Sequence, residues 1–248
     1  MDDADFWLMF RRAAKLSGST LQARVNLDRP DEGIQAFNAT TDRCDFRLLS
    51  ISPDEHGGWP AKLVDTYTRG GDTVAAYAGT ESWPFAPQIY WTAETNQLGG
   101  AAVHSLSVVI SIQTDRLDTH PQIFVRSSLP ADEVLRVSVA GDELLVDSHA
   151  DGELHIDPQA VACCQLWRLP GGELTYAEIV PASDFSQLSV ERVGRQAASR
   201  WKLFAEFLEK GVIRRARLQA MFLPREDDVQ LAAECCQAID RRPLPLTT

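Results

Sequence analysis

The sequence predicts a β-rich α+β fold, a large antiparallel β-sandwich or strongly curved sheet with helices near the N- and C-termini. Three observations favour this class. From about residue 46 to residue 180, apolar and polar side chains alternate, which is the period of a strand with one buried face. Turn sequences rich in glycine and proline interrupt this pattern at short intervals. Near both termini the apolar spacing changes to that of an amphipathic helix.

Chain length and continuity favour a single domain. The 248 residues suffice for one large β domain or for two small ones. No linker, internal repeat or low-complexity segment divides the chain. We therefore expect one domain over residues 1–248, with a β-rich body at about 20–192. A C-terminal helix–strand–helix unit at about 195–241 should pack on that body.

The first expected element is a helix over residues 2–16. Phe6, Phe10 and Ala13 fall on one helical stripe. Acidic residues precede this stripe and basic residues follow it, an order that complements the helix dipole. A serine–glycine turn would end the helix, and an alternating pattern then predicts a strand at 21–27.

The β-rich body should contain many short strands joined by tight turns. In the clearest strand, Leu106, Val108 and Ile110 alternate with serines, so one face should be buried and the other wet. Adjacent glycines supply the positive φ of two hairpin turns, at 70–71 and 171–172. The expected strands are 46–51, 63–68, 73–78, 88–92, 106–112, 123–126, 134–139, 144–146, 161–168 and 174–180.

The helical pattern returns after about residue 193. Ala197, Trp201 and Leu208 lie on one stripe of a helix expected at 196–210. Gly211 follows where a left-handed C-cap belongs. The sequence therefore predicts that this helix packs its aromatic side chains into the core and stops at the glycine.

The remaining residues predict a strand and a second helix. Alternation favours a strand at 212–222, which Pro224 ends. An amphipathic helix is expected at 227–241, with acidic residues at its start. Prolines keep the tail at 243–248 extended.

The charge balance argues against nucleic-acid and membrane partners. The chain carries 24 basic and 35 acidic residues, a formal net charge of −11. Nucleic-acid binders and proteins of anionic membranes depend on basic patches, so we expect neither partner. No apolar run approaches the roughly 20 residues that span a bilayer, and the first residues are acidic where a secretory signal is basic. We therefore expect a cytoplasmic protein.

Cysteines and histidines give no signal for a metal or a cofactor. The five cysteines stand as Cys44 and two adjacent pairs, 163–164 and 235–236, without the spacing of zinc sites. We expect free, mostly buried thiols. Acidic residues and histidines alternate over 147–157, but the Asp-Gly pair at 151–152 is a preferred hairpin loop. Such a hairpin would place the two histidines on opposite faces, so we expect no metal and no cofactor.

An aromatic segment at 83–91 is the strongest candidate for a ligand site. Aromatic rings beside polar groups bind sugars and other flat ligands. Trp83, Tyr90 and Trp91 are therefore the candidate ligand-binding residues. The alternative is that these rings fill the core where a strand begins.

Two histidines are the candidate proton-transfer groups. His56 lies in an expected loop and His104 near the start of a strand. Together with Trp59 and Glu81, these histidines could join the aromatic segment in one site if the fold brings them close. The nucleotide-binding, serine-hydrolase and zinc-protease motifs are missing from the sequence, which disfavours those enzyme classes.

These observations leave more than one hypothesis of function. The first is a non-catalytic cytoplasmic protein that binds a small molecule or a protein partner through its antiparallel sheet or aromatic segment. The alternative is an enzyme that acts on a carbohydrate or similar polar metabolite by histidine and carboxylate acid–base chemistry. A third hypothesis makes the chain a subunit of a homo-oligomer or other complex, with 243–248 as an extended peptide for the partner.

The C-terminal segment also resembles a known group of proteins. The run Phe-Ala-Glu-Phe-Leu-Glu-Lys-Gly-Val-Ile-Arg-Arg-Ala-Arg at 204–217, Phe-Leu-Pro-Arg at 222–225 and the ending Pro-Leu-Pro-Leu-Thr-Thr at 243–248 are similar to bacterial proteins of the planctomycete type. The resemblance covers under a fifth of the chain. Because that group has no assigned chemistry, the resemblance implies no site residue and no activity.

Overall fold

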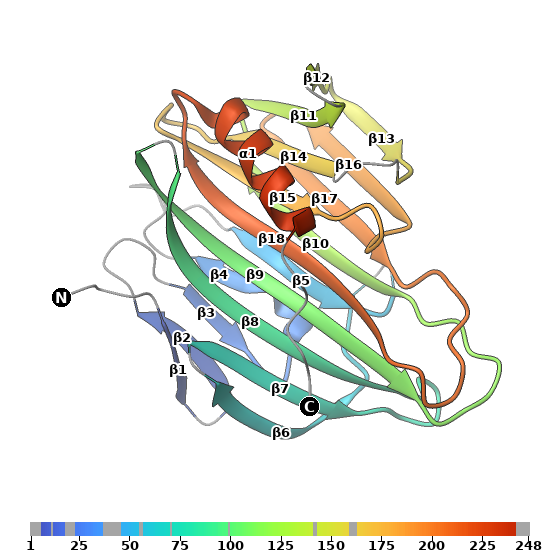
Figure 1. Cartoon of the computed structure of the whole chain (residues 1–248). Coiled ribbons are helices and arrows are strands. Elements are labelled where there is room, and N and C mark those ends of the chain that lie inside the picture. The colour runs from blue at the N-terminus through green and yellow to red at the C-terminus, as the bar shows by residue number, and fades with distance from the viewer. Residues whose placement is uncertain are drawn as a thin grey trace.

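The described strands form a β-sandwich of two antiparallel sheets with nine strands each, and an α-helix lies on its outside (Figure 1). This computed structural model describes residues 6–10, 12–17, 23–36, 46–54, 57–69, 71–98, 100–140, 143–158 and 163–241. The large antiparallel sandwich that the sequence predicts is therefore confirmed. The N-terminal helix is not, because the described residues of that segment are strands.

Sheet I combines the N-terminal strands with strands from the middle and end of the chain. Its order is β1 (Phe6–Phe10), β2 (Ala13–Ser17), β3 (Ala23–Asn26), β4 (Ile34–Ala36), β5 (Arg47–Ser52), β10 (Ile123–Pro130), β17 (Gln196–Leu203), β16 (Gln187–Val193) and β13 (Gly152–Ile156). A short 3-10 helix, η1 (Pro30–Glu32), lies against β5, where the Ser50 hydroxyl donates to the Asp31 carbonyl. The outer face of sheet I is thus partly covered at β5.

Sheet II contains the longest strands. Its order is β12 (Glu143–Ser148), β11 (Glu133–Ala140), β14 (Cys163–Arg168), β15 (Leu174–Val180), β18 (Arg214–Pro224), β9 (Ala101–Thr114), β8 (Phe85–Leu98), β7 (Asp72–Ala78) and β6 (Lys62–Arg69). The hairpins expected around residues 70–71 and 171–172 are confirmed as β6–β7 and β14–β15. The strand expected at 212–222 is confirmed as β18.

The main core lies between the two sheets. Leu106, Val108, Ile110 and Ile112 of β9 are each at most 1% exposed, as their alternation with polar residues predicts. Burying each such side chain contributes roughly 1.5–3 kcal/mol. The other inner-face strands contribute the largest fully buried side chains, which include Trp91, Trp167 and Trp201.

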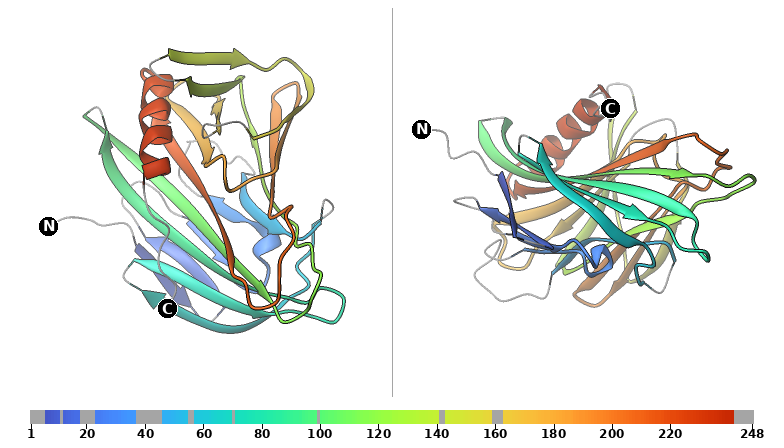
Figure 2. Two further views of the ribbon diagram at one scale, coloured as in Figure 1. Left: turned by 45° about the vertical axis from the view of Figure 1, so that its right-hand side comes forward. Right: turned by 90° about the horizontal axis from the view of Figure 1, so that it is seen from below.

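The helix predicted at 227–241 is confirmed as α1 (Asp228–Arg241), and it packs on the outer face of sheet II (Figure 2). Leu231 and Ile239 join a second apolar cluster with Leu166 and Met221 of the sheet. Among the described residues, α1 covers only part of this nine-stranded face. None of the helices in the described part of the chain is both long and apolar enough to cross a membrane.

The helix expected at 2–16 is wrong, because the described part of that segment is the hairpin β1–β2. Trp7 and Ala14 are buried, at 3% and 0% exposure, on the face that turns toward sheet II. A short helix depends on tertiary packing for its stability. Here the neighbouring strand β3 offers β2 backbone partners, so the segment completes the sheet instead.

The helix expected at 196–210 is also wrong, and its first half is strand β17. Ala197 and Trp201 are four residues apart. This spacing places two side chains on one face of a helix, and it also places them on one face of a strand, where every second side chain points the same way. Ser199 and Leu203 are buried on the same side, which is the strand period. The C-terminal unit is therefore strand–strand–helix, and Gly211 is a loop residue with φ 79° rather than a helix cap.

The hairpin expected over 147–157 does not form. β12 pairs with β11 in sheet II, whereas β13 pairs with β16 in sheet I. β12 and β13 thus each pair with a strand of a different sheet. A two-residue hairpin loop would instead have paired them with each other. His149, in the connection between these strands, is buried at 9% exposure, and His155 is on the exposed face of β13.

Candidate functional site

The candidate ligand-binding residues of the aromatic segment do not form one site. Trp91 faces the core from the inner side of β8 and is 1% exposed. Its neighbour Tyr90 points to the outer face, because successive side chains of a strand alternate. There the Tyr90 hydroxyl donates to Gln88 Oε1 at 2.7 Å. Burial, and then the proximity of Tyr67, raises the pKa of Tyr90 to about 12, so the phenol stays protonated.

Trp83 lies at the end of the sandwich, apart from the other two. Its ring is 5.7 Å from that of Trp59 and 5.3 Å from that of Phe85, and Trp59 in turn lies edge-on to Tyr77 at 5.0 Å. Trp59 thus lies beside the first residue of the aromatic segment. The half-buried Trp59 and Trp83 rings pack against the core, and they close it at this end.

His104, the candidate catalytic histidine that the structure describes, is not brought to these aromatic rings. His104 is half-buried on β9, and its Nδ1 lies 2.9 Å from Thr95 Oγ1 on β8. Trp91 pairs with Val108, four residues further along β9, which corresponds to about 13 Å of strand. His56 lies outside the described residues. Within the described ranges, no three histidine, cysteine, aspartate or glutamate side chains converge as metal ligands.

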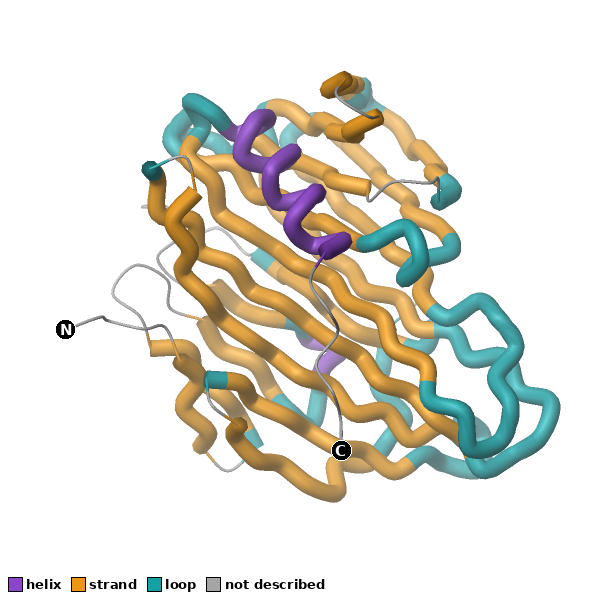
Figure 3. The backbone as a smooth tube through the Cα atoms, viewed as in Figure 1, coloured by secondary structure: helices purple, strands orange, loops and turns teal. Residues whose placement is uncertain are grey.

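A pocket of about 580 Å³ opens at the same end of the sandwich, and we call it the end pocket. The loops that follow β7, β9 and β17 gather there (teal, lower right in Figure 3). Its size falls within the range of small-molecule sites. It is lined by Ala78, Gly79, Thr80, Glu81, Pro84, Phe85, Ala86, Gln113, Thr114, Asp115, Arg116, Lys210 and Gly211.

A tightly hydrogen-bonded turn forms one wall of the end pocket. The Thr80 N–H donates to the Trp83 carbonyl at 3.0 Å, and the Phe85 N–H donates to the same oxygen at 2.9 Å. A Cβ at Gly79 would lie 2.5 Å from the Phe85 oxygen and 2.7 Å from the Trp83 oxygen. Only glycine allows the chain to pass so close, so the sequence itself fixes this wall.

Thr114, at the end of β9, joins that wall to the opposite one. Its hydroxyl donates to the Pro84 carbonyl at 2.9 Å and accepts from the Arg116 N–H at 3.2 Å. Its carbonyl accepts from the Gly211 N–H at 3.0 Å. The walls are therefore held by the protein's own hydrogen bonds, and such a preformed pocket spares a ligand part of the ordering cost of binding.

The lining chemistry suits a polar ligand with several hydroxyl groups. Glu81 and Asp115 provide carboxylate acceptors, and Arg116 and Lys210 provide cationic donors. Phe85, with nearby proline and alanine side chains, supplies apolar wall. A mixed set of donors and acceptors beside an apolar surface is typical of sites that orient small polar molecules.

Sequence reasoning found only part of this site. Glu81 and the neighbouring aromatic segment were identified from composition. Asp115, Arg116 and Lys210 were missed, because single charged residues in loops carry no local signal. β8 pairs with β9, which brings Phe85 opposite Thr114. This pairing brings Asp115 and Arg116 to the same pocket as Glu81.

Two other polar clusters have structural roles. In the first, the buried Glu178 carboxylate joins the sheets. It accepts from Tyr176 OH at 2.8 Å, Ser199 Oγ at 2.7 Å and Trp201 Nε1 at 2.7 Å, and also from the Ser127 hydroxyl. Burial, and then the charge of Glu178, raises the pKa of Tyr176, so its phenol remains a donor.

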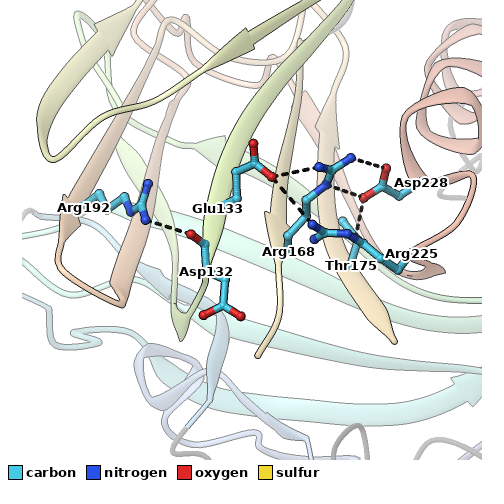
Figure 4. A network of polar contacts seen from close by, with 7 residues as sticks. All are labelled: Asp132, Glu133, Arg168, Thr175, Arg192, Arg225 and Asp228. Atoms are coloured by element: carbon cyan, nitrogen blue, oxygen red, sulfur yellow. Dashed lines mark hydrogen bonds and ion pairs between the residues drawn. The ribbon is translucent and has the colours of Figure 1, made fainter. Parts of the chain in front are cut away.

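The second cluster holds α1 against sheet II (Figure 4). Asp228, at the start of the helix, accepts two hydrogen bonds from the Arg168 guanidinium, at 2.9 and 3.0 Å, and one from the Thr175 hydroxyl at 2.6 Å. Arg168 also reaches Glu133 at 2.8 Å. Burial opposes ionisation of Asp228, but the bonds from Arg168 and Thr175 outweigh it and lower its pKa.

Comparison with known proteins shows the fold. The sequence matches no family model and no curated protein. A galactose mutarotase related enzyme from Lactobacillus acidophilus superposes with a TM-score of 0.55 at 9% identity, over 88% of this chain and 97% of that one. At this identity the likeness is one of fold. The resemblance to planctomycete-type proteins stays a prediction.

Two further solved structures are more distant. A putative aldose 1-epimerase from Klebsiella pneumoniae gives a TM-score of 0.49 at 9% identity, over 97% of this chain and 90% of that one. The GH36 α-galactosidase AgaB from Geobacillus stearothermophilus gives 0.48 at 8% identity, over 88% of this chain. The chain spans only 41% of the length of that α-galactosidase.

Proposed function

We propose that this chain binds a carbohydrate or a similar polyhydroxylated metabolite in the end pocket. One observation carries the proposal: a small-molecule-sized pocket in which two carboxylates and two cations line walls that the protein itself holds in place. Sugars present many hydroxyl groups, each able to donate and accept, and a few apolar C–H faces. The Glu81, Asp115, Arg116 and Phe85 side chains match both features.

The fold supports the same ligand class. The matched Lactobacillus protein is titled a galactose mutarotase related enzyme. A shared fold does not transfer an activity, because sites differ within a fold. It does favour carbohydrates among the polar metabolites that a pocket of this size would accept.

An enzyme is the second candidate, and it rests on the two carboxylates. Glu81 comes from the loop after β7 and Asp115 from the end of β9, so they line the end pocket from separate segments. Carboxylates on separate walls could serve as acid and base toward one bound sugar. This version of the enzyme hypothesis assigns proton transfer to carboxylates in place of His56 and His104.

A nuclear magnetic resonance titration tests the binding proposal. The full ¹⁵N-labelled chain is titrated with a panel of neutral monosaccharides at constant pH and salt. We expect saturable shifts of the amides at 79–83, 85–86, 113–116 and 210–211 with at least one sugar. If none of the panel moves these amides at tens of millimolar, the proposal fails.

Matched variants assign the binding to the pocket. Glu81→Gln and Asp115→Asn each remove one charged acceptor without changing shape, and we expect about tenfold weaker binding for each, or about 1.4 kcal/mol. Asp65→Asn, on the exposed face of β6, should bind as the unmodified chain does. Equal weakening in all three variants would contradict a site at the pocket.

Optical rotation separates a binding protein from an enzyme. A freshly dissolved α-anomer of the best ligand relaxes to its anomeric equilibrium at a rate that a mutarotase increases. The enzyme hypothesis expects faster relaxation that Glu81→Gln and Asp115→Asn abolish. Relaxation at the spontaneous rate, with binding intact, would support the binding protein and remove anomer interconversion from the candidate reactions.

A further inference from the structure

Two loops at the end of the sandwich carry exposed apolar side chains, which we call the apolar rim. Leu117, in the loop after β9, is 75% exposed. Phe207, Val212 and Ile213, in the segment between β17 and β18, are between 39% and 48% exposed. Single exposed apolar residues are ordinary on a protein surface, but apolar side chains that gather in one place mark a binding surface.

The two loops of the apolar rim are held against each other. The Leu208 N–H donates to the Thr119 carbonyl at 2.9 Å, and the Thr119 hydroxyl donates to the Leu208 carbonyl at 2.8 Å. The ring centres of Phe207 and His120 are 5.5 Å apart. Both loops extend from the same end of the sandwich (Figure 3). These contacts hold Phe207 beside the loop that carries Leu117.

The apolar rim begins where the lining of the end pocket stops. Leu117 directly follows Arg116, which lines the pocket. Val212 directly follows Gly211, which lines the pocket from the other loop. The Gly211 N–H donates to the Thr114 carbonyl at 3.0 Å, so both loops are also joined at the pocket wall.

Strand pairing places Ile213 beside the same wall. The register of β18 with β9 begins at Arg214 opposite Ile112, so the next residues outward, Ile213 and Gln113, adjoin each other. Gln113 is in turn paired with Ala86, and both of these residues line the end pocket. Ile213 therefore continues a row of residues that forms part of the pocket.

We propose that the ligand of the end pocket is a glycoside with an apolar aglycone, and that the apolar rim binds this aglycone. The inference rests on the proposed function, which assigns the sugar to the end pocket. There Glu81 and Asp115 accept from sugar hydroxyl groups, while the rim removes the apolar group from water. Because the rim starts at the pocket lining, a group attached to the bound sugar reaches it directly. A glycoside cannot interconvert its anomers, so this ligand class accords with the binding protein.

The experiment is a titration of the ¹⁵N-labelled full chain with methyl and hexyl β-glucosides and β-galactosides, below the concentration at which the hexyl compounds form micelles. Each fully buried methylene strengthens binding roughly fourfold, so burial of two of the five additional methylenes predicts about tenfold tighter binding of a hexyl glycoside. We expect the hexyl compound to shift the amides at 117–120 and 206–213 in addition to those at 79–83. The methyl compound should shift mainly the amides at 79–83.

The possible failures separate this inference from the proposed function. If free sugars or methyl glycosides bind in the end pocket and the hexyl compounds bind no more tightly, the inference is overturned and the proposed function stands. If a hexyl glycoside shifts the rim amides without those at 79–83, the alkyl chain binds without its sugar, and the inference is again overturned. If no sugar and no glycoside binds, both fail.

Variants assign the tighter binding to the apolar rim. Leu117→Ser and Ile213→Ser should each reduce the hexyl-to-methyl affinity ratio at least threefold and leave the affinity for the methyl glycoside within twofold. The control is Val193→Ser, at the end of β16, where the side chain is 68% exposed. Amide spectra confirm that each variant is folded. An equal reduction in Val193→Ser would show nonspecific contact of the alkyl chain and overturn the inference.

A second copy of the chain is the competing occupant of the apolar rim. Sedimentation velocity compares the mass of the unmodified chain with that of Ile213→Ser over a range of protein concentrations. We expect the same mass for both proteins at every concentration. If the unmodified chain forms an oligomer that Ile213→Ser dissociates, the rim is an interface between copies and the inference is overturned.

Discussion

The two faces of β10 and β17 use polar side chains in opposite ways. On the inner face, Ser127 and Ser199 donate to the Glu178 carboxylate, together with Trp201. On the outer face, Arg126 and Arg200 stand opposite each other. The inner cluster matches one acceptor group to four donors, whereas the outer face carries two arginines at paired positions of the two strands.

The difference teaches how to separate polar residues that stabilise from those that are available for function. A buried polar group needs its hydrogen bonds made within the protein, and the Glu178 cluster meets this need. A side chain at the surface can instead form its contacts with solvent, so its loss costs little stability. Variants on the inner face should therefore lower the free energy of unfolding, variants on the outer face should change it little, and variants in the end pocket should change binding.

Replacing Glu178 by leucine should have the largest effect. The change leaves two serine hydroxyls, a phenol and an indole N–H buried without their acceptor, at 1–3 kcal/mol per unsatisfied group in the unrelaxed case. We expect the free energy of unfolding, measured in urea, to fall by about 3–5 kcal/mol.

The control for this variant is Glu191→Gln on the neighbouring strand β16, where the carboxylate is exposed. It should unfold at nearly the urea concentration of the unmodified chain. Similar unfolding midpoints for Glu178→Leu and the control would show that the inner cluster does not hold the sheets together.

Asp228→Asn should come next, at about 2–3 kcal/mol, because it breaks charge-assisted bonds to Arg168 and a bond from Thr175. The folded-state pKa of Asp228 is lowered from 3.8, so its stabilisation is present above that pH and is lost as the pH falls through the folded value. The difference in free energy of unfolding between the unmodified chain and Asp228→Asn should thus be constant near neutrality and disappear below about pH 3.8. A difference that persists in acid would contradict this assignment. The control is Asp227→Asn, an exposed position at the start of the same helix.

Adjacent substitutions on β17 sharpen the comparison. Ser199→Ala removes a donor to the buried carboxylate and should cost about 1–2 kcal/mol in urea unfolding. Arg200→Gln should change stability by no more than about 0.5 kcal/mol, because this half-buried surface side chain makes only long contacts, 3.6 Å to Glu153 and 3.4 Å to Ser189. If Arg200→Gln lowers the free energy of unfolding more than Ser199→Ala does, the assignment of stability to the inner face is wrong.

His149 should produce the smallest effect, seen as a pH dependence. Burial, as the largest cause, lowers its pKa below 6.5; the neighbouring Gln165 side chain and the charge of Asp147 oppose this, and the charge of Arg136 adds to it. Since the unfolded chain gains the proton first, His149 makes stability fall as the pH drops below about 6.5. His149→Gln should flatten that slope in urea unfolding, and an unchanged slope would contradict the buried neutral histidine.

The strands could be predicted where periodicity had one interpretation. The alternation of Leu106, Val108 and Ile110 fits only a strand, and it was confirmed. Ala197 and Trp201 fit both a helix and a strand, and there the prediction was wrong, because sheet pairing with β10 decided the outcome. The helix predicted at 2–16 was wrong for the same reason, because its described residues pair as strands of sheet I.

The candidate site could be predicted only in part, since it depends on long-range pairing. Glu81 and the aromatic segment that contains Phe85 were identified from local composition, but Asp115 and Lys210 reach the end pocket only through the pairings of β9 with β8 and β18. Likewise, Arg126 and Arg200 are 74 positions apart and meet only in the β10–β17 register. No local pattern contains that information.

A crystal structure of the chain soaked with the best monosaccharide of the panel tests the central claim most directly. We predict sugar density in the end pocket, with hydroxyl groups within hydrogen-bonding distance of Glu81 and Asp115 and a C–H face toward Phe85. Soaked Glu81→Gln crystals, at the same concentration, should show weaker density. An empty end pocket beside a sugar bound elsewhere on the molecule would contradict the proposed site.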